Sequence, residues 1–342
     1  MRRRPLRAHN FAPFSAPKAR ASPRWSPRRY GSGVATLAMR SHLSRLVAGT
    51  PTVPLFDEAT GCTIWLKLEF LLPSGSTKDR VAAFVLTHAI ETGAVRDDSI
   101  VVEASSGSTS IAFAMACAVV GVRFRAVMPE GVSGERILMI RRYGGEVVLT
   151  PAAGGIAGAI VETRRMAADD ARVFLPRQFE NPLNALAHQR ITGPELLSQI
   201  DGTVHGFCAG VGTGGTLMGI ARALREAGHA TRVARVIPEH GICFKNEPEV
   251  CGGIPGIVDG LSTILDEREV SCVESISIPD REAICAAREL IARGFSVGPS
   301  TGLNVAGARR LATQLGPGHN IATVACDRME RYFSTDLFRD LR

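Results

Sequence analysis

Short apolar runs alternate with longer helical patterns along the chain from about residue 47 onward. The apolar runs are typical of buried strands, and the segments between them place hydrophobic residues three or four positions apart, as helices do. Strands that alternate with helices of this length form parallel sheets covered on both faces. The predicted strands are residues 64–68, 100–103, 125–128, 146–149, 206–209, 233–237 and 321–325. The predicted helices are residues 78–92, 109–120, 134–143, 156–167, 216–227, 281–292 and 304–314.

This order of elements predicts an α/β fold with two lobes, each built on a mostly parallel, twisted sheet flanked by helices. At 342 residues the chain exceeds the size at which a single core stops growing. We assign residues 46–180 to an N-terminal lobe and residues 181–336 to a C-terminal lobe. This assignment allows the first strands of the N-terminal segment to pack on the other lobe.

The charge of the chain is concentrated in its first residues. Residues 1–45 hold ten arginines and one lysine but no Asp or Glu, so with +7 for the whole chain the remainder is −4. The folded part is therefore mildly acidic, which argues against nucleic-acid binding as the main function. The basic segment lacks hydrophobic periodicity, and we expect a disordered tail. Its composition fits an organellar transit signal; a start at Met39 and a phosphate-binding tail are the alternatives.

The remaining composition is that of an ordinary globular protein, with 45% hydrophobic and 21% charged residues. No apolar run approaches the roughly 18 residues that span a bilayer, so we expect no membrane segment. The cysteines show neither a C-x-x-C pair nor zinc-type spacing, so no metal site is predicted and buried thiols in a reducing cytoplasm are expected. They are residues 62, 117, 208, 243, 251, 272, 285 and 326.

One lysine stands at the start of a predicted helix, directly after the glycine- and serine-rich turn in residues 73–80. The helix prediction rests on apolar residues at helical spacing after Lys78 and on Gly93, which can close the helix. Exposed N–H groups at a helix start carry positive partial charge, so a lysine there loses some preference for its charged form. Such an amine suits a nucleophile and base near neutral pH. A solvated surface lysine is the alternative.

A second motif is the glycine-rich segment 210–216, between a predicted strand and a predicted helix. Its N–H groups can converge on an anion, and the helix dipole adds to the attraction. The Gly-Lys-Ser/Thr ending of a nucleotide P-loop is absent. Gly210, Gly212 and Gly215 also match the dinucleotide fingerprint, with Glu239 where a ribose-binding acid could sit. A nicotinamide oxidoreductase is therefore a competing interpretation, and a plain tight turn is another.

A third motif, residues 105–110, has hydroxyl side chains at five of six positions. Helix capping accounts for one of them, whereas the whole set forms a nest suited to a carboxylate. Residues 298–304 form a fourth turn before a helix, which alone indicates only a capped turn. His188 is assigned a structural role, and His88 and His205 are assigned none.

Taken together and in this order, the four motifs resemble those of the cysteine synthase family of pyridoxal-phosphate (PLP) enzymes. This fold-type-II group includes cystathionine β-synthase, and the resemblance spans residues 46–335. It extends to residues 178–182 (QFENP), to His188, to residues 192–195 (TGPE), and to residues 327–332. The resemblance implies PLP as cofactor, a homodimer, and two lobes with parallel sheets.

The resemblance also implies a role for each motif. Lys78 would hold PLP as a Schiff base and later remove the substrate Cα proton. Ser300 would hydrogen-bond the pyridine nitrogen, and because a serine cannot keep that nitrogen protonated, prompt loss of a β-substituent is favoured. The residues implied to hold the cofactor phosphate are Gly212, Thr213, Gly214, Gly215 and Thr216. The residues implied to hold the substrate carboxylate are Ser105, Ser106, Thr109 and Gln178.

Two features depart from the common family pattern. Ser108 replaces an Asn that contacts both cofactor and substrate, and together with residues 299–302 it is more similar to the cysteine-desulfhydrase-like branch. The expected reaction is β-elimination to an aminoacrylate followed by addition of sulfide or a thiol, which makes cysteine from an activated serine such as O-acetylserine. The alternatives are a β-elimination lyase, namely a cysteine desulfhydrase or serine/threonine dehydratase, and a non-catalytic binding protein on the same fold.

Overall fold

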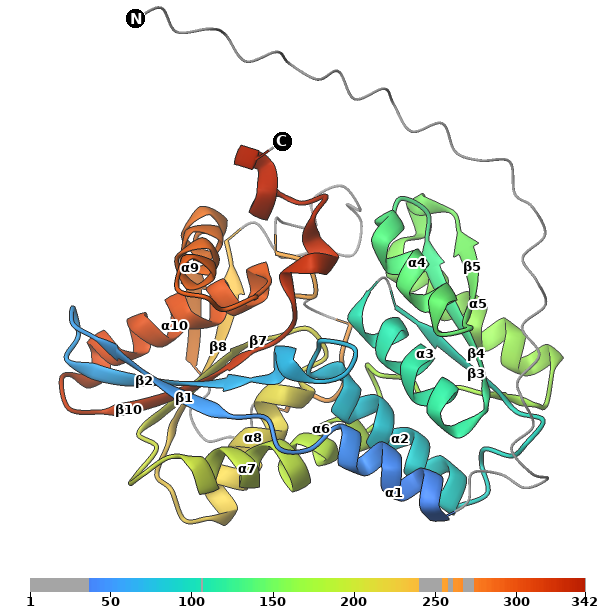
Figure 1. Cartoon of the computed structure of the whole chain (residues 1–342), viewed down its shortest axis with the longest axis horizontal. Coiled ribbons are helices and arrows are strands. Elements are labelled where there is room, and N and C mark those ends of the chain that lie inside the picture. The colour runs from blue at the N-terminus through green and yellow to red at the C-terminus, as the bar shows by residue number, and fades with distance from the viewer. Residues whose placement is uncertain (1–36, 106, 240–253, 258–260, 267–273, 342) are drawn as a thin grey trace, which may run out of the picture.

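The structure is a computed structural model that describes residues 37–105, 107–239, 254–257, 261–266 and 274–341 (Figure 1). Ser106 and residues 1–36 of the predicted tail lie outside the described residues. The tail boundary predicted at residue 45 is wrong, because α1 (Leu37–Leu46) is helical and Leu43 is fully buried in the core.

The larger sheet has six strands, and its central strands come from distant parts of the sequence (Figure 1). The first two strands pair antiparallel as a hairpin, and all other pairs are parallel. The last strand of the chain, β10, lies between β2 and β7, so the N-terminal hairpin joins the sheet of the C-terminal half. The strand order is β1 (Thr52–Asp57), β2 (Cys62–Leu68), β10 (Asn320–Ala325), β7 (Gly206–Gly210), β8 (Arg232–Pro238) and β9 (Glu274–Ile278).

The smaller sheet has four strands, all parallel. Every residue of its inner strand β3 is buried, as expected for a parallel strand with helices on both faces. The strand order is β5 (Glu146–Thr150), β4 (Arg123–Pro129), β3 (Ile100–Ala104) and β6 (Val173–Phe174).

Helices cover both faces of each sheet. One face of the larger sheet packs on α9 (Asp280–Ala292) and α10 (Pro299–Leu315), and the other packs on α7 (Gly193–Gln199) and α8 (Gly215–Glu226). The smaller sheet lies between α5 (Gly155–Asp169) and a second layer. That layer contains α1, α2 (Lys78–Glu91), α3 (Ser108–Val120) and α4 (Gly134–Arg142). A short helix, α6 (Leu183–Ala187), and a π-helical turn (His188–Thr192) precede α7.

All seven predicted strands and all seven predicted helices are present, and their ends differ by at most two residues except at α10. That helix begins five residues earlier than predicted, at Pro299, whose fixed φ suits a first helical position. Gly302 does not interrupt α10. A Cβ there would lie 2.0 Å from the carbonyl oxygen of Ala283, so this glycine lets α9 and α10 pack closely. The ranges missed were those of α1, β1, β6, α6, α7 and β9.

Candidate functional site

Lys78 is the first residue of α2, and the segment before it is fixed to the end of β10. The N–H of Thr77 donates to the carbonyl of Cys326 (2.8 Å), and Ser76 pairs with Asp327 in an isolated antiparallel bridge. These contacts hold the start of α2 against the carboxyl end of a parallel strand, the edge of a sheet at which ligands bind.

The amine of Lys78 is partly buried, and none of the described residues forms a hydrogen bond or ion pair with it. Burial lowers the pKa of Lys78, and the nearby Cys326 and Asp327 oppose part of that shift. The net lowering increases the share of neutral amine, which is the form that acts as nucleophile or base.

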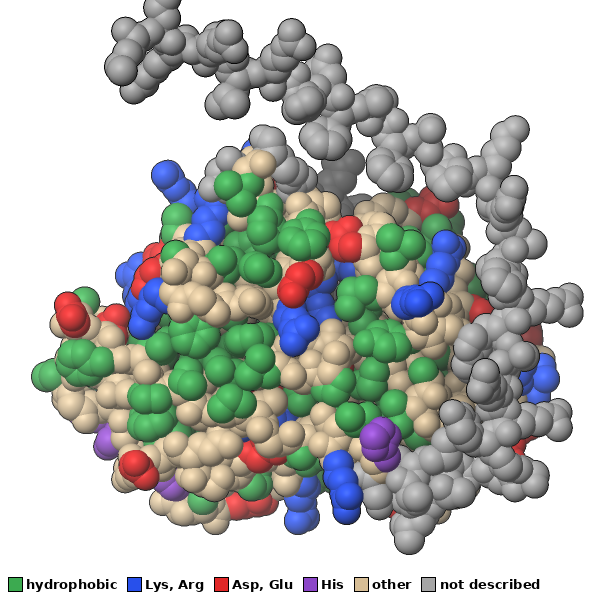
Figure 2. Space-filling view, viewed as in Figure 1, with side chains coloured by type: hydrophobic (Ala, Val, Ile, Leu, Met, Phe, Trp, Pro, Cys, Tyr) green, Lys and Arg blue, Asp and Glu red, His purple; other side chains and the backbone are tan. Residues whose placement is uncertain are grey.

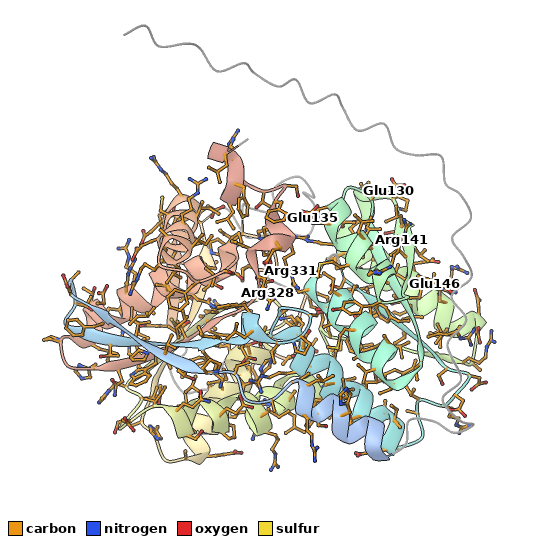
Figure 3. The ribbon with its side chains drawn as sticks, viewed as in Figure 1. Glu130, Glu135, Arg141, Glu146, Arg328 and Arg331 are labelled. Carbon is orange, nitrogen blue, oxygen red and sulfur yellow. The ribbon has the colours of Figure 1, made fainter. Side chains whose placement is uncertain are left out.

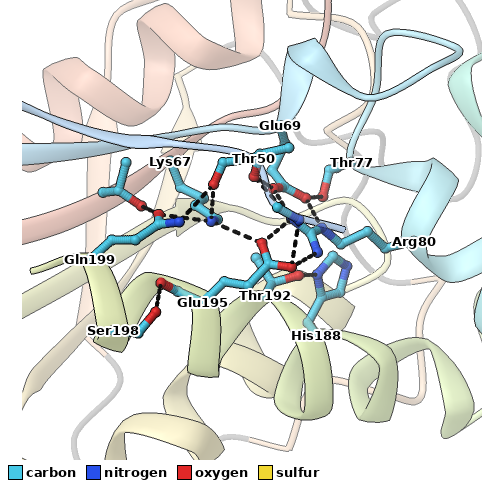
Figure 4. A network of polar contacts seen from close by, with 12 residues as sticks. Thr50, Lys67, Glu69, Thr77, Arg80, His188, Thr192, Glu195, Ser198 and Gln199 are labelled. Atoms are coloured by element: carbon cyan, nitrogen blue, oxygen red, sulfur yellow. Dashed lines mark hydrogen bonds and ion pairs between the residues drawn. The ribbon is translucent and has the colours of Figure 1, made fainter. Parts of the chain in front are cut away.

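Directly behind Lys78, a buried network of charges holds the first turn of α2 in place (Figure 4). The guanidinium of Arg80 contacts the carboxylates of Glu69 (2.5 Å) and Glu195 (2.7 Å). Glu195 also contacts the amine of Lys67 (3.0 Å), which donates to the carbonyl of Thr50 (2.5 Å). The network ties α2 to β2 and α7, so Lys78 projects from a rigid base.

The loop between β7 and α8 accepts only glycine at three positions. A Cβ on Gly212 would lie 2.3 Å from the carbonyl oxygen of Gly256, and one on Gly215 would lie 2.0 Å from Oδ1 of Asn184. Gly214 has a φ of +79°, a conformation that glycine adopts without strain. The loop opens α8, a helix of 12 residues. Its N–H groups and the helix start therefore suit an anion such as a phosphate.

Asn184, which the sequence analysis missed, connects this glycine loop to the predicted substrate loop. Its side-chain amide donates to the carbonyl of Gln178 (2.8 Å) and to the hydroxyl of Thr213 (2.9 Å). Thr213 in turn accepts the N–H of Gly215 (3.4 Å). The one available indication was its place in the helical turn directly after the QFENP segment.

The structure brings Thr109 and Gln178 together although they are 69 positions apart. The Thr109 hydroxyl donates to Oε1 of Gln178 (2.6 Å), whose amide nitrogen donates to the carbonyl of Ala104 (2.9 Å). Ser105 is buried beside them and accepts the N–H of Gly107 (3.2 Å). The second amide proton of Gln178, the hydroxyl proton of Ser105 and the N–H groups at the start of α3 can donate to a carboxylate.

Ser108 is bonded to the C-terminal segment. Its hydroxyl donates to Oδ2 of Asp327 (2.9 Å) and accepts from Nη1 of Arg331 (2.9 Å). Tyr332 also donates to Oδ2 of Asp327 (2.6 Å), whereas Oδ1 is buried without a hydrogen-bond partner among the described residues. Figure 2 shows charged side chains gathered between the two halves of this face, where Figure 3 places Arg328 and Arg331.

Ser300 lies in the first turn of α10 and is buried. It hydrogen-bonds the thiol of Cys326, and burial raises the pKa of that thiol to about 11. Asn304 donates to Cys326 (3.3 Å) and accepts the N–H of Gly210 (2.7 Å), so it joins the end of β10 to the glycine loop. Neither Cys326 nor Asn304 is assigned a role from the sequence, because Cys326 belongs to no motif and Asn304 only ends the fourth turn, which alone indicates a capped helix start.

These groups fit a phosphorylated aldehyde cofactor. An amine without a partner can form the covalent link, a glycine cradle at a helix start can hold a phosphate, and a buried hydroxyl can face a ring nitrogen. The described part of the chain contains no cluster of three or more His, Cys, Asp or Glu side chains arranged for a metal ion. Within the same residues, no helix is both long and apolar enough to cross a membrane.

Comparison with known proteins gives consistent matches over most of the chain. Residues 43–327 match the family described as pyridoxal-phosphate dependent enzyme. Cysteine synthase B of Campylobacter jejuni is 36% identical over 303 residues, covering 88% of this chain and 100% of the relative.

Two solved structures are similar in fold and sequence. A hydrogen sulfide-producing enzyme from Fusobacterium nucleatum has a TM-score of 0.82 and 32% identity, covering 89% of this chain and 93% of that one. The O-acetylserine dependent cystathionine beta-synthase from Helicobacter pylori has a TM-score of 0.81 and 30% identity, covering 86% and 98%.

Proposed function

The chain belongs to the pyridoxal-phosphate dependent enzymes, among the relatives of cysteine synthase, and we propose that it forms cysteine from O-acetylserine and sulfide. The reaction class is PLP-dependent β-replacement or elimination on a small amino acid. Membership of this enzyme family argues against a nicotinamide oxidoreductase as the interpretation of the glycine loop, and against a non-catalytic binding protein on the same fold.

The observation that carries the proposal is the amine of Lys78, which has no hydrogen-bonding or ionic partner among the described residues and lies near both predicted loops. Asp327, which interacts electrostatically with this amine, bonds Ser108 of the hydroxyl-rich loop. The charge of Lys78 contributes to the lowered pKa of His188, and Nε2 of His188 lies 3.3 Å from Oγ1 of Thr216 in the glycine loop. A covalent anchor between an anion cradle and a carboxylate site is the arrangement that this chemistry requires.

We assign each group the role that its surroundings support. Bound PLP supplies an electron-withdrawing ring that makes the substrate Cα–H acidic and lets the β-substituent leave. Lys78 would hold the cofactor covalently and, when its amine is free again, would accept the Cα proton, since its lowered pKa favours the neutral amine. Ser300 would serve as a neutral hydrogen-bonding partner for the pyridine nitrogen.

Two sets of residues bind the anionic groups. Ser105, Ser106, Thr109 and Gln178 would hold the substrate carboxylate, and Ser106 lies outside the described residues. Gly212, Thr213, Gly214, Gly215 and Thr216 would hold the cofactor phosphate at the start of α8. Ser108, bonded to Asp327 and Arg331, would contact the cofactor.

Elimination from cysteine, with release of hydrogen sulfide, is the second candidate. It is supported by the fold and sequence likeness to the Fusobacterium nucleatum enzyme, which has also been solved with an α-aminoacrylate intermediate. Product analysis separates the two: purified protein is given O-acetylserine, O-phosphoserine, serine or cysteine, with and without sulfide. Cysteine formation from O-acetylserine and sulfide supports synthesis, sulfide and pyruvate from cysteine support elimination, and no turnover contradicts both.

We further propose a homodimer located in the cytoplasm. Buried free thiols, those of Cys62, Cys117 and Cys208, support a reducing compartment. Figure 2 shows hydrophobic side chains gathered over the six-stranded half, and Phe56 of β1, a strand of that sheet, is 65% exposed; both support a partner surface. Sedimentation of the purified protein tests the dimer.

A further inference from the structure

Glu103 is a buried acidic residue near the end of β3, just before the loop to which we assign the substrate carboxylate. Its carboxyl group accepts the backbone N–H groups of Ala104, Arg177 and Gln178. The carbonyl of Ala104 in turn accepts the side-chain amide of Gln178 (2.9 Å). Residues 103 and 104 therefore hold Gln178 by its backbone and by its side chain.

The residue before Gln178 has an unusual backbone conformation. Arg177 has a φ of +53°, and it is the one residue other than glycine with a positive φ in the described part of the chain. Residues with a Cβ seldom adopt this conformation. The carbonyl of Arg177 accepts the N–H groups of Glu180 and Asn181 (2.9 Å each), so the chain turns sharply here. Such a turn needs support from its surroundings.

The side chain of Arg177 provides little of that support. It is 63% exposed, and its ion pair with Glu180 is long at 3.8 Å. Exposed ion pairs contribute little to stability. Glu180 also pairs with Arg164 of α5, another exposed side chain. The buried contact of Arg177 is the one from its backbone N–H to Glu103.

The surroundings of Glu103 favour its neutral form. Glu103 lines a small pocket of about 20 Å³ between β3 and α5, and its Oε2 is buried without a hydrogen-bond partner among the described residues. The charged groups that line this pocket with it are Arg164, Arg177 and Glu180, and both arginines pair with Glu180. Burial raises the pKa of Glu103 to about 8. A neutral acid still accepts N–H groups but places no negative charge behind Gln178.

We propose that Glu103 is a positioning residue for substrate binding, whose carboxyl group holds the left-handed turn at Arg177 and thereby fixes Gln178. It does so as a neutral acid. Thr109 donates to Oε1 of Gln178 and the carbonyl of Ala104 takes one amide proton, so one amide proton remains for the substrate carboxylate. The inference rests on the proposed role of Gln178 in binding that carboxylate.

The test measures ligand binding to the PLP-loaded, full-length protein through the absorbance of the bound cofactor. L-Alanine carries the carboxylate but has no β-substituent to lose, and ethylamine lacks the carboxylate. Glu103→Met removes the acceptor and should weaken alanine binding about tenfold, with ethylamine binding and PLP retention unchanged. Glu103→Gln keeps an acceptor oxygen and should bind alanine within about twofold of the wild type. Equal weakening for both ligands would overturn the proposal.

A second substitution shows whether Glu103 acts through the turn. Glycine adopts a positive φ without strain, so Arg177→Gly should recover most of the alanine affinity that Glu103→Met loses. Arg177→Ala is the matched control, because it removes the same pair with Glu180 but keeps the Cβ, and it should recover none. Failure of the glycine to rescue, or equal rescue by the alanine, would show that Glu103 does not act through the turn.

The pH dependence of binding keeps the test decisive if Glu103→Met fails to fold. As the pH rises through 8, Glu103 ionises, and its charge repels the substrate carboxylate beyond Gln178. Between pH 7 and pH 9 the wild type should lose alanine affinity relative to ethylamine severalfold, whereas Glu103→Gln, which cannot ionise, should not. Parallel profiles of the two proteins contradict the proposal. A wild type whose cofactor absorbance responds to neither ligand would instead contradict the proposed function.

Discussion

Two buried regions with charged side chains lie side by side in this protein. They differ in whether those side chains have hydrogen-bonding or ionic partners. Around Arg80, each cation faces a carboxylate, and Lys67 has Glu195 and the carbonyl of Thr50 as partners. Around the start of α3 and the end of β10, the amine of Lys78 has no hydrogen-bonding or ionic partner among the described residues. One carboxyl oxygen each of Glu103 and Asp327 is likewise unpaired within the described chain.

The difference shows which charges stabilise the fold and which remain available for chemistry. Burial lowers the pKa of both lysines, but Lys67 is held as an ion-pair partner whereas Lys78 is not. The network around Arg80 fixes the helix from which Lys78 projects. The position of Lys78 therefore depends on the ion pairs around Arg80.

The largest expected effect comes from removing Lys78. Lys78→Ala should abolish the absorbance of covalently bound PLP and lower turnover about 10³-fold or more, because the anchor and the base are the same group. Borohydride reduction followed by peptide mapping should label Lys78 in the wild type. The control is Lys67→Met, which should keep the absorbance of bound PLP. A label on Lys67 in the wild type would mean that Lys67, and not Lys78, carries the cofactor.

The next effect is a pH dependence of stability that arises from Glu103. Burial raises the pKa of this carboxyl to about 8, from an ordinary value of 4.5, although neighbouring N–H groups oppose the shift. The folded state thus holds the proton more tightly, and the resulting stability is lost as the pH rises through 8.

Glu103→Gln cannot ionise and should avoid that loss. Between pH 5 and pH 9 the wild type should lose on the order of 3 kcal/mol of unfolding free energy relative to this variant. Urea denaturation at the two pH values measures the difference. Equal pH profiles of the unfolding free energy in the wild type and the variant would show that folding does not raise the pKa of Glu103.

A smaller effect is expected when one partner is removed from the compensated network. Lys67→Met retains the volume of a fully buried side chain but leaves Glu195 with only Arg80 and the N–H of Gly49 as partners among the described residues. The free energy of unfolding should fall by about 2 kcal/mol, less than for a pair that loses its only partner. Denaturation at neutral pH measures it, and an unchanged stability would mean that Lys67 contributes little to the network.

The smallest effect is expected when Ser108 is replaced, and it concerns the ratio of cysteine formed to pyruvate formed. This hydroxyl is occupied by Asp327 and Arg331, whereas a longer amide could reach the cofactor and the substrate carboxylate together. Ser108→Asn should therefore raise cysteine formation relative to pyruvate formation severalfold with O-acetylserine and sulfide. If the ratio is unchanged or falls, Ser108 does not control the partition.

Much of the fold was predictable because strands and helices in this chain are strongly periodic and bounded by glycine turns. Lys78 was found at the first position of its helix because the turn before it is distinctive in sequence. The start of α10 differs from the prediction because residues 298–304 are typical of a turn in sequence, whereas Gly302 lies within the helix and allows close packing against α9.

The rest of the site could not be predicted because it depends on contacts between distant segments. Asn184 and Cys326 belong to no motif, and Asn304 only ends a turn that by itself indicates helix capping. All three gain their roles only when β10 and α6 meet the glycine loop. The π-helical turn at His188 has no periodic signature of its own.

The position of β10 has a consequence for how the protein is made. This last strand separates the β1–β2 hairpin from the β7–β8–β9 group, and its end fixes the segment before Lys78. A nascent chain that has not yet emerged as far as residue 325 consists of two unjoined sheet fragments. A chain that ends before β10 therefore lacks both the strand that joins these fragments and the contact that holds the segment before Lys78.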